Sequence, residues 1–225
     1  MKNVGCRIVS DFNRPDVELV NLFKDLPVAN IDDCMNRMGA IDSHFFPLNK
    51  TPLLGVAFTV KVPEGDNLMF HKAMDIAQPG DVIMVDAGGD KHRAILGELM
   101  ISYCKSRGIA GVIVDGSVRD ADALEEMDFP VYAKGVTPNG PYKNGPGEIN
   151  TPVTIGGQVV CPGDIVVGDQ DGVVIIKPED AKELAKQTRK VTEKETLIME
   201  EIVKKGTYNR PWVNEKLEEL GCEYL

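Results

Sequence analysis

Apolar and polar residues follow two different periods along the chain, and this pattern predicts an α/β protein. Short apolar runs typical of buried strands occur at 53–61, 81–89, 110–115 and 129–135. Between these runs, apolar residues recur at helical spacing over 66–81, 91–106 and 118–127. Strands that alternate with helices in this way form parallel βαβ units. The middle of the chain is therefore predicted to be a parallel sheet with crossover helices.

Glycine and proline mark the ends of several of these elements. Pro79 and Gly80 stop the first helix, and Gly108 is a natural C-cap for the second. The run 81–89 ends in two glycines, which predicts a buried strand followed by a tight loop.

Residues after 150 follow a different pattern, because hairpins replace the alternation of strand and helix. Two glycines at the centre of 153–160 predict one β-hairpin, and 164–178 predict a second. Hairpins beside a parallel unit imply a mixed architecture with more than one sheet.

Helical patterns occupy both ends of the chain. Within 16–40, Asn30 stands three residues before Asp33 and is placed to cap a helix. From Pro178 to about Lys205, charged and apolar residues recur as in a long helix with proline near its start.

The length of 225 residues suits one domain of moderate size. No internal repeat or low-complexity linker interrupts the sequence, so residues 1–225 are predicted to form a single domain. The tail, 206–225, carries the only tryptophan and is expected to pack on this domain or on a neighbouring subunit.

Charge narrows the possible partners. The formal net charge is −10, and no run is rich in lysine or arginine, so we expect no nucleic-acid partner. No apolar run approaches the roughly 20 residues of a membrane helix, and the first residues lack a signal-peptide core. We therefore expect a cytoplasmic protein with no membrane partner. An anionic substrate remains compatible, because one arginine or metal ion can dominate a pocket.

Cysteine and histidine form no recognisable metal site. The five cysteines are an odd number without a CxxC pair, which favours ordinary reduced thiols. His44, His71 and His92 are widely spaced, and each is expected at the surface or in the core. Lys61 and Lys72 are the lysines to consider as Schiff-base nucleophiles, but no neighbouring residue marks either one.

Two loops carry the candidate chemistry, at 86–100 and 115–122. Both follow the C-terminal ends of predicted parallel strands, where ligands of open α/β sheets bind. Arg119 offers a rigid fork of donors for a carboxylate or a developing enolate oxygen. Asp120 is a hard oxygen ligand suited to Mg²⁺ or Mn²⁺, and Mg²⁺ commonly uses only one or two carboxylates.

The residues Gly97, Glu98, Leu99 and Met100 form the other half of this candidate site. Their backbone N–H groups would face an anion if a helix begins there. A glycine inside a helical pattern costs about 1 kcal/mol relative to alanine, and close approach of a ligand would be one reason for Gly97.

Simpler interpretations of the same residues stay open. Ser117 and Asp120 match an S-x-x-D capping box, which needs no metal. Arg119 has Asp115, Asp120 and Asp122 nearby as possible ion-pair partners, and Gly97 can simply let two elements pack closely.

Five motifs in order resemble the RraA-like family: "QPGDV", "DAGG", "GELM", "GSVRD" and "GDQDGVV". The resemblance covers roughly residues 25–205. This family includes the class II 4-hydroxy-4-methyl-2-oxoglutarate / 4-carboxy-4-hydroxy-2-oxoadipate aldolases and the ribonuclease E inhibitor RraA. It implies a β/β/α swivelling-domain-like (phosphohistidine-domain-like) fold with mixed sheets and a long C-terminal helix. It also implies a homotrimer or a dimer of trimers, with sites at subunit interfaces.

Matching motifs imply roles for individual residues. The backbone amides of Gly97, Glu98, Leu99 and Met100 would hold the pyruvyl group of the substrate. Arg119 would bind the substrate and steady the enolate oxygen, Asp120 would bind Mg²⁺, and Glu98 would hold a metal-bound water. Carboxylates of a neighbouring subunit's C-terminal helix, Glu193 or Glu195, are the candidates for completing the outer shell.

The family pattern is not fully kept. Its aldolases usually carry an acidic residue three positions after the metal-binding aspartate, and here that position is Ala123. RraA itself lacks the metal-binding aspartate, so Asp120 favours the metal enzyme over the inhibitor.

The sequence therefore predicts a class II, metal-dependent lyase that releases pyruvate from a 4-hydroxy-2-oxo di- or tricarboxylic acid. Oxaloacetate decarboxylation passes through the same enolate and is expected as a further activity, with Arg119, Asp120 and Glu98 as catalytic residues. The alternative is an RraA-type protein inhibitor of ribonuclease E without catalysis. A menaquinone-pathway methyltransferase is disfavoured, because no glycine-rich strand–loop–helix is present to hold S-adenosylmethionine.

Overall fold

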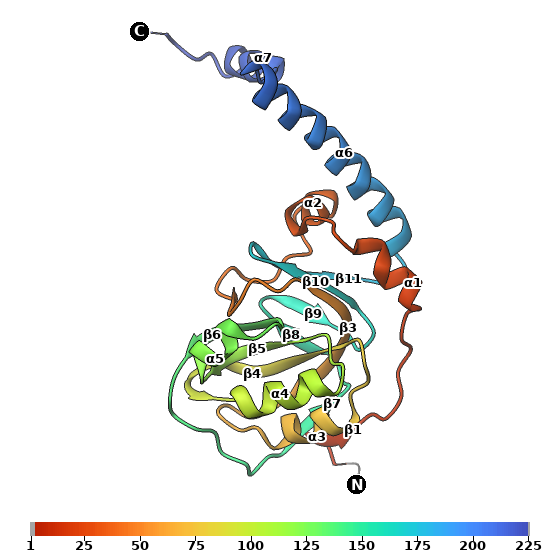
Figure 1. Cartoon of the computed structure of the whole chain (residues 1–225), viewed down its shortest axis with the longest axis vertical. Helices are drawn as coiled ribbons and strands as arrows, with labels where there is room; N and C mark the ends of the chain where they lie inside the picture. The colour runs from red at the N-terminus through yellow and green to blue at the C-terminus, as the bar shows by residue number, and fades with distance from the viewer. Residues whose placement is uncertain (1–2, 225) are drawn as a thin grey trace. The chain divides into compact units, whose positions relative to one another are not determined.

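Four parallel strands form the centre of the fold in the computed structural model, which describes residues 3–224. The strands hydrogen-bond side by side in the order β3 (Leu53–Lys61), β4 (Asp81–Ala94), β5 (Gly111–Val118) and β6 (Val131–Val136) (Figure 1). Apart from Val136 at the end of β6, their valine and isoleucine side chains are buried, as in parallel sheets that are covered on both sides. The predicted βαβ units are confirmed.

Further strands extend this sheet on both sides. One edge of β3 is shared, because β10 (Ile165–Asp169) pairs with its first half and β7 (Gly147–Ile149) with its last residues, both antiparallel. The outer strands are β11 (Gly172–Ile176) beside β10, β1 (Cys6–Ile8) beside β7 and β2 (Phe46–Pro47) beside β6.

The two predicted hairpins are both present. Strands β10 and β11 form one of them within the large sheet. Strands β8 (Val153–Ile155) and β9 (Gln158–Val160) form the other as a separate two-stranded sheet. The expectation of more than one sheet is therefore confirmed.

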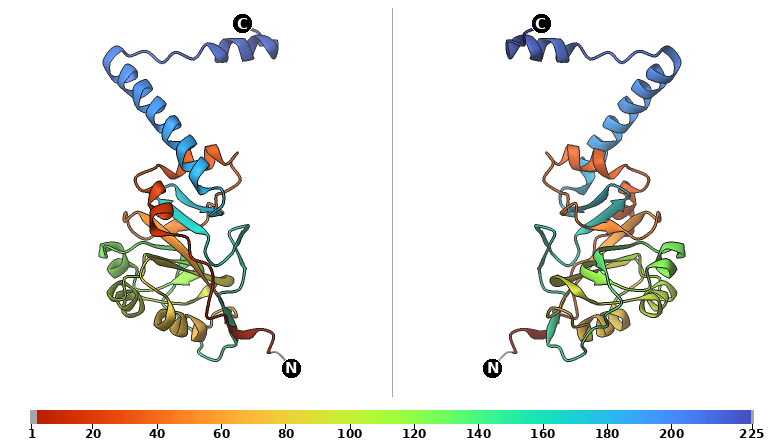
Figure 2. Two further views of the ribbon diagram at one scale, coloured as in Figure 1. Left: turned by 90° about the vertical axis from the view of Figure 1, so that its right-hand side faces the viewer. Right: turned by 90° about the vertical axis from the view of Figure 1, so that its left-hand side faces the viewer.

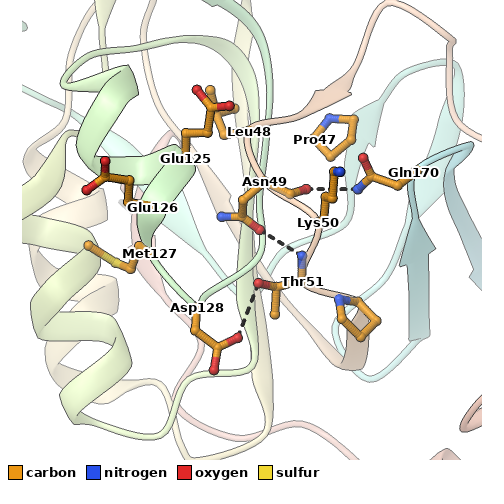
Figure 3. A pocket seen from close by; sticks show the side chains of 11 residues that line it. Pro47, Leu48, Asn49, Lys50, Thr51, Glu125, Glu126, Met127, Asp128 and Gln170 are labelled. Carbon is orange, nitrogen blue, oxygen red and sulfur yellow. Dashed lines mark hydrogen bonds between the residues drawn. The ribbon is translucent and has the colours of Figure 1, made fainter.

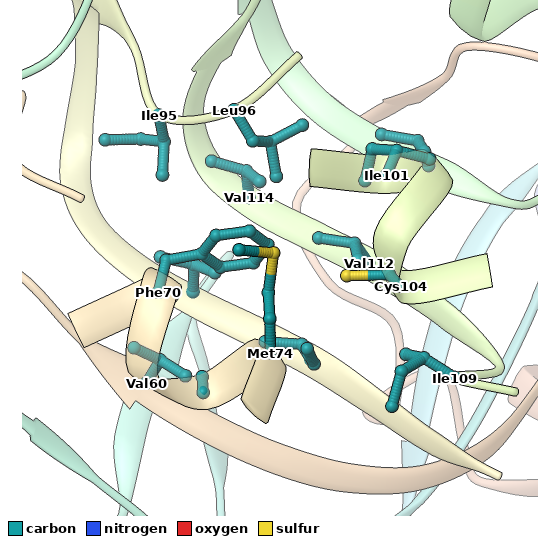
Figure 4. Close-up of a cluster of buried hydrophobic side chains, with 14 of the residues drawn as sticks. Val60, Phe70, Met74, Ile95, Leu96, Ile101, Cys104, Ile109, Val112 and Val114 are labelled. Carbon is teal, nitrogen blue, oxygen red and sulfur yellow. The ribbon is translucent and has the colours of Figure 1, made fainter. Parts of the chain in front are cut away.

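Three helices cover one face of the parallel strands: α3 (Leu68–Ile76), α4 (Glu98–Ser106) and α5 (Ala121–Glu126). Phe70 and Met74 of α3 and Ile101 and Cys104 of α4 pack with strand residues such as Val114 (Figure 4). Burial raises the pKa of the Cys104 thiol to about 12, so this thiol stays protonated as part of the core.

The opposite face of the strands carries the β8–β9 hairpin, as the side views in Figure 2 show. Val153, Ile155 and Val160 of the hairpin pack over Ile113 and Tyr132 of the sheet. A third cluster joins β10 and β11 to α1 (Val17–Val20), the 3₁₀ helix η1 (Asn21–Phe23), α2 (Val28–Cys34) and the first turns of α6 (Ala181–Lys205).

The chain divides into two units, Met1–Thr188 and Arg189–Leu225. The second unit holds the rest of α6 and the short helix α7 (Pro211–Glu219). Within α6, Lys204 and Lys205 pair with Glu200 and Glu201 one turn earlier. The single domain and the packing of the tail stay predictions. No helix in the described part is long and apolar enough to cross a membrane.

The helix predicted over 91–106 begins later than expected, at Glu98. Strand β4 continues through Ala94, and its pairing with β5 shifts register twice, after Asp86 and after Asp90. Gly88 and Gly89 both have positive φ, +68° and +75°, which lets the strand bulge instead of ending in a loop. The Gly-Gly pair was therefore wrongly interpreted as the end of the strand, although the C-cap at Gly108 is in place with φ +73°.

The helical region predicted over 16–40 is broken into three short helices. The predicted cap is wrong, because α2 begins after Pro27 and Asn30 lies inside it. Asp33 pairs with Arg37 instead, at 2.9 Å. Proline is well tolerated at the start of a helix, because its missing N–H would have no partner there. Pro27 was therefore the better sequence marker for the start of α2.

Phe70 should contribute heavily to stability, because its side chain is 0% exposed at the centre of the helix-covered face. We expect Phe70→Ala to lower the free energy of unfolding by about 3–5 kcal/mol, from lost burial and the cavity that remains. Urea denaturation followed by circular dichroism measures this. The matched control is Lys72→Ala, an exposed residue of the same helix, which should change stability by no more than about 0.5 kcal/mol. Equal effects of the two substitutions would contradict this account of the core.

Candidate active site

A pocket of about 410 Å³ lies where the segments that follow β4 and β5 meet. Backbone hydrogen bonds join these segments: the N–H of Ile95 donates to Ser117 O at 2.8 Å, and the N–H of Arg119 donates to Leu96 O at 3.0 Å. The structure thus brings together the two loops that the sequence singled out. The residues lining the pocket are Asn67, His71, Ala94, Ile95, Leu96, Gly97, Leu99, Met100, Arg119, Asp120, Gly140, Pro141 and Lys143.

Asp120 caps a helix, but not the helix that the sequence suggested. Its Oδ2 accepts the backbone N–H of Glu98, the first residue of α4, at 3.0 Å. It makes no side-chain cap to α5, and the hydroxyl of Ser117 donates to Lys91 O at 3.1 Å. The S-x-x-D capping box is therefore absent. Asp120 has φ +59°, a left-handed conformation that aspartate tolerates better than most residues, and this conformation turns the chain beside α4.

Gly97 is required where the two segments cross. A Cβ at this position would collide with Oδ2 of Asp120 and would lie 2.8 Å from Cγ of Arg119. The simpler interpretation of Gly97, close packing of two elements, is therefore correct. The residues that pack against it are the two with candidate chemistry, so the glycine also fixes the geometry of the site.

The guanidinium of Arg119 is largely uncommitted. Its side chain is 46% exposed, and its Nε lies 3.8 Å from Oδ2 of Asp120, beyond hydrogen-bond distance. Asp115, considered above as a partner, pairs with Lys134 at 2.9 Å. Among the described residues, Arg119 has no closer ion pair, so its donors can meet an anion in the pocket.

Two of the four backbone N–H groups predicted to bind substrate are already used. That of Glu98 donates to Asp120, and that of Met100 donates to Gly97 O at 3.1 Å. The N–H groups of Gly97 and Leu99 donate to no residue in the described range 3–224. They stand at the start of the nine-residue helix α4, where partial positive charge favours an anion.

His71 and Lys143 also line the pocket. The sequence predicted His71 only as a surface or core residue, and it gave Lys143 no role in the site. His71 belongs to α3, and this helix begins beyond the C-terminal end of β3, at the same edge of the sheet as the two loops. That position was the available signal, since ligands collect at this edge.

The loop that carries Lys143 is held by buried and charged groups. Asp66, which is 3% exposed, accepts the N–H groups of Asn144 at 2.6 Å and Gly145 at 3.0 Å through Oδ2. Arg93 donates to Gly140 O and to the hydroxyl of Tyr142, each at 2.8 Å, and its guanidinium stacks over the Tyr142 ring. These contacts fix the backbone on both sides of Lys143.

The residues present fit a divalent metal ion only with help from water and substrate. Within the described range, no three His, Cys, Asp or Glu side chains cluster so as to hold a metal. Asp120 remains the one carboxylate in the pocket lining, which suffices for Mg²⁺ when water and ligand oxygens fill its other positions. Glu98 is exposed and does not line the pocket, and Glu193 and Glu195 belong to α6 in the second unit.

A larger hollow of about 620 Å³ lies at the other end of the parallel strands, before β3 and β6 (Figure 3). Some of its polar groups bond within the protein: Gln170 donates to Asn49 O at 2.9 Å, and Thr51 donates to Asp128 at 3.3 Å. Its lining sets one cation, Lys50, against the carboxylates of Glu125, Glu126 and Asp128, which disfavours an anion. We therefore place the candidate chemistry in the smaller pocket, where two cations face a single carboxylate.

Comparisons with known proteins identify the relatives of this chain. A family model described as RraA-like, aldolase/RraA, matches residues 28–175. A Halalkalibacterium halodurans protein with the provisional name 4-hydroxy-4-methyl-2-oxoglutarate aldolase is 39% identical over 185 residues, covering 81% of this chain and 88% of that protein.

Solved structures give the same result. The RNA-processing inhibitor RraA from Thermus has a TM-score of 0.62 at 28% identity, covering 68% of this chain and 93% of that one. RraAS2 from Streptomyces coelicolor, described as an unusual member of the RNase ES inhibitor RraA family, has a TM-score of 0.73 at 28% identity, covering 83% and 98%. The predicted fold, with its mixed sheet and long C-terminal helix, is confirmed.

His71 should titrate below its ordinary value. Desolvation lowers the pKa of His71 from 6.5, the charge of Lys143 lowers it further, and Asp75 opposes the shift. The unfolded chain therefore binds this proton more readily, so this residue costs stability as pH falls below about 6.5. We expect Lys143→Met to raise the pKa of His71, as measured by NMR titration of the imidazole.

The control for this titration is Lys72→Met, which removes an exposed lysine that does not line the pocket. It should leave the His71 titration where it is. Identical titrations in wild type and Lys143→Met would show that the Lys143 charge does not reach His71.

Proposed function

We propose that this chain, which belongs to the RraA-like family, is a class II lyase that releases pyruvate from a 2-oxo acid with Mg²⁺ or Mn²⁺ held at Asp120. The observation that carries this proposal is the uncommitted guanidinium of Arg119 beside Asp120 and the start of α4. The provisional name of the Halalkalibacterium relative supports the aldolase branch.

The charges of the pocket favour an anionic substrate. The chain as a whole has a net charge of −10, yet its pocket lining holds Arg119 and Lys143 against the single carboxylate of Asp120. The N–H groups of Gly97 and Leu99 add two more donors. A carboxylate of the substrate meets these N–H groups and the positive end of α4, while Arg119 binds the neighbouring oxo oxygen.

The substrate class that fits is a 4-hydroxy-2-oxo di- or tricarboxylic acid. In the cleavage, the hydroxyl proton leaves, the C3–C4 bond breaks, and its electrons move onto the 2-oxo group to give the enolate of pyruvate and a carbonyl product. Protonation at C3 then gives pyruvate. Arg119 stabilises the developing oxygen charge with fixed donors that need no reorganisation.

A bound divalent ion would supply Lewis-acid polarisation of the 2-oxo group. Asp120 would hold it, and the Glu98 N–H keeps the Asp120 carboxylate oriented for that purpose. Loss of carbon dioxide from oxaloacetate leaves the same enolate, so the same residues support oxaloacetate decarboxylation.

We further propose that the active form is a homotrimer or a dimer of trimers. The pocket lining of one subunit holds a single carboxylate, and a second subunit would bring further carboxylates to the metal ion. Glu193 and Glu195 on α6 are the candidates. Size-exclusion chromatography with light scattering tests the assembly.

Asp120 should be essential to the reaction. We expect Asp120→Ala to lower kcat/KM for pyruvate release by at least roughly 100-fold, with 4-hydroxy-4-methyl-2-oxoglutarate or oxaloacetate as substrate. Release is followed through lactate dehydrogenase, with Mg²⁺ and with EDTA. The control is Asp122→Ala, which removes an exposed carboxylate of α5 outside the pocket lining. Full activity of Asp120→Ala, or of wild type in EDTA, would refute the metal role.

Gly97 should be equally sensitive for a steric reason. We expect Gly97→Ala to lower kcat/KM by roughly 100-fold, because the new methyl group displaces Asp120 and Arg119. Gly140→Ala is the matched control, since its Cβ would meet Nη1 of Arg119 at an ordinary 3.5 Å. The same assay measures both, and similar losses in the two variants would contradict the steric argument.

A second candidate is a protein inhibitor of a ribonuclease. It is favoured by the likeness to the Thermus and Streptomyces proteins, which are described as an RNA-processing inhibitor and a member of an RNase ES inhibitor family. Binding of the chain to a ribonuclease E-type enzyme, unaffected by EDTA and by Asp120→Ala, would support this role.

A further inference from the structure

We propose that Asn67 recognises the hydroxyl group of the substrate, and that this contact separates aldol cleavage from decarboxylation in one pocket. The inference rests on the proposed function and adds a specificity-determining residue to it. Asn67 precedes α3, lines the pocket and is only 1% exposed.

The amide of Asn67 is fixed on one side and unpartnered on the other. Its Nδ2 donates to Ile95 O at 2.8 Å, and its backbone N–H donates to Tyr142 O at 3.0 Å. Its Oδ1 is buried and accepts no hydrogen bond from any residue of the described chain. The amide cannot turn over, because Oδ1 would then face Ile95 O, and a carbonyl oxygen only accepts.

A buried acceptor without a donor destabilises a protein unless something supplies the donor. The pocket is where this donor can come from. The other polar groups of the lining are mainly donors: Arg119, Lys143 and the free N–H groups at the start of α4. They suit carboxylate and oxo oxygens, whereas the Asn67 oxygen suits an O–H group.

The proposed substrates differ in this one respect. A 4-hydroxy-2-oxo acid with ionised carboxylates has a single hydrogen-bond donor, its hydroxyl group. Oxaloacetate in its oxo form has none. An acceptor placed in the pocket therefore distinguishes the two substrates, while Arg119 and the α4 N–H groups bind what they share.

Met100 contacts the same side-chain amide of Asn67 from the lining of the pocket. Its sulfur lies 3.7 Å from Nδ2 of Asn67. In this structure Oδ1 of Asn67 is covered. Methionine has an unbranched chain with three rotatable bonds, and we infer that its movement lets a ligand in the pocket reach this amide at low cost.

The hydrogen bond orients the hydroxyl group and does not take its proton. An amide oxygen is too weak a base to hold that proton, which leaves to water as the C3–C4 bond breaks. Asn67 therefore acts on the aldol reaction alone, by holding the O–H group in the geometry for cleavage.

The test compares two reactions in the full-length protein. Pyruvate release from 4-hydroxy-4-methyl-2-oxoglutarate and from oxaloacetate is measured with Mg²⁺ for wild type and Asn67→Ala. We expect kcat/KM for the hydroxy acid to fall by about 10- to 100-fold and that for oxaloacetate to change by less than about 3-fold. Equal losses would show a merely structural role for Asn67 and overturn the inference, as would no loss in either reaction.

A second measurement needs only the wild-type protein, in case the variant does not fold. 4-Hydroxy-2-oxoglutarate and 2-oxoglutarate, which differ by the hydroxyl group, compete with oxaloacetate. Release of carbon dioxide is the readout, because cleavage of the hydroxy acid would itself produce pyruvate but no carbon dioxide. We expect the hydroxylated compound to bind at least about 10-fold more tightly, and equal inhibition would overturn the inference. Failure of the proposed function is a separate result, because wild type would then release pyruvate from neither substrate.

Discussion

The hydrogen bond from the Glu98 N–H to the Asp120 carboxylate is the contact on which the candidate site depends. It joins the first residue of α4 to the turn after β5, across a glycine with no room for a side chain. The bond satisfies one free N–H at the start of the helix and leaves others exposed to the pocket. The same geometry sets Arg119 beside these donors, so one local contact organises both the donors available to an anion and the carboxylate that we propose as the metal ligand.

This arrangement also explains how a strongly acidic chain would bind an acidic substrate. The net charge of the chain is −10, whereas the pocket brings together two cations, Arg119 and Lys143, and the start of α4. A metal ion at Asp120 would face Arg119 as a like charge. Oxygens of an anionic substrate would attract both, so metal and substrate would support each other's binding.

The sequence predicted much of the fold because the strands are apolar runs and the helices are bounded by glycine and proline. It failed at Gly88 and Gly89, where two glycines mark a bulge inside β4, and at Asn30, where Pro27 begins the helix. A local sequence pattern cannot show whether a neighbouring strand continues to pair. At Gly88 and Gly89, continued pairing of β4 with β5 keeps the strand going.

The candidate site was predictable only in part, for a related reason. Arg119, Asp120 and Gly97 stand in motifs next to predicted strand ends, so the sequence placed them together. Asn67 and Lys143 come from segments far apart in the chain, and nothing in their neighbours marks them. What holds Lys143 at the pocket is the buried Asp66, whose carboxylate binds a loop more than seventy residues later.

The Asp66-bound loop has a consequence for how new specificities arise. Its backbone is held by Asp66 and Arg93, and Lys143 contributes none of those hydrogen bonds. The side chain at 143 can therefore be exchanged without rebuilding the scaffold beneath it. Natural variation, or a directed library at this one codon, can change the charge and size of the side chain that lines the pocket at 143. The candidate site at Arg119 and Asp120 stays in place.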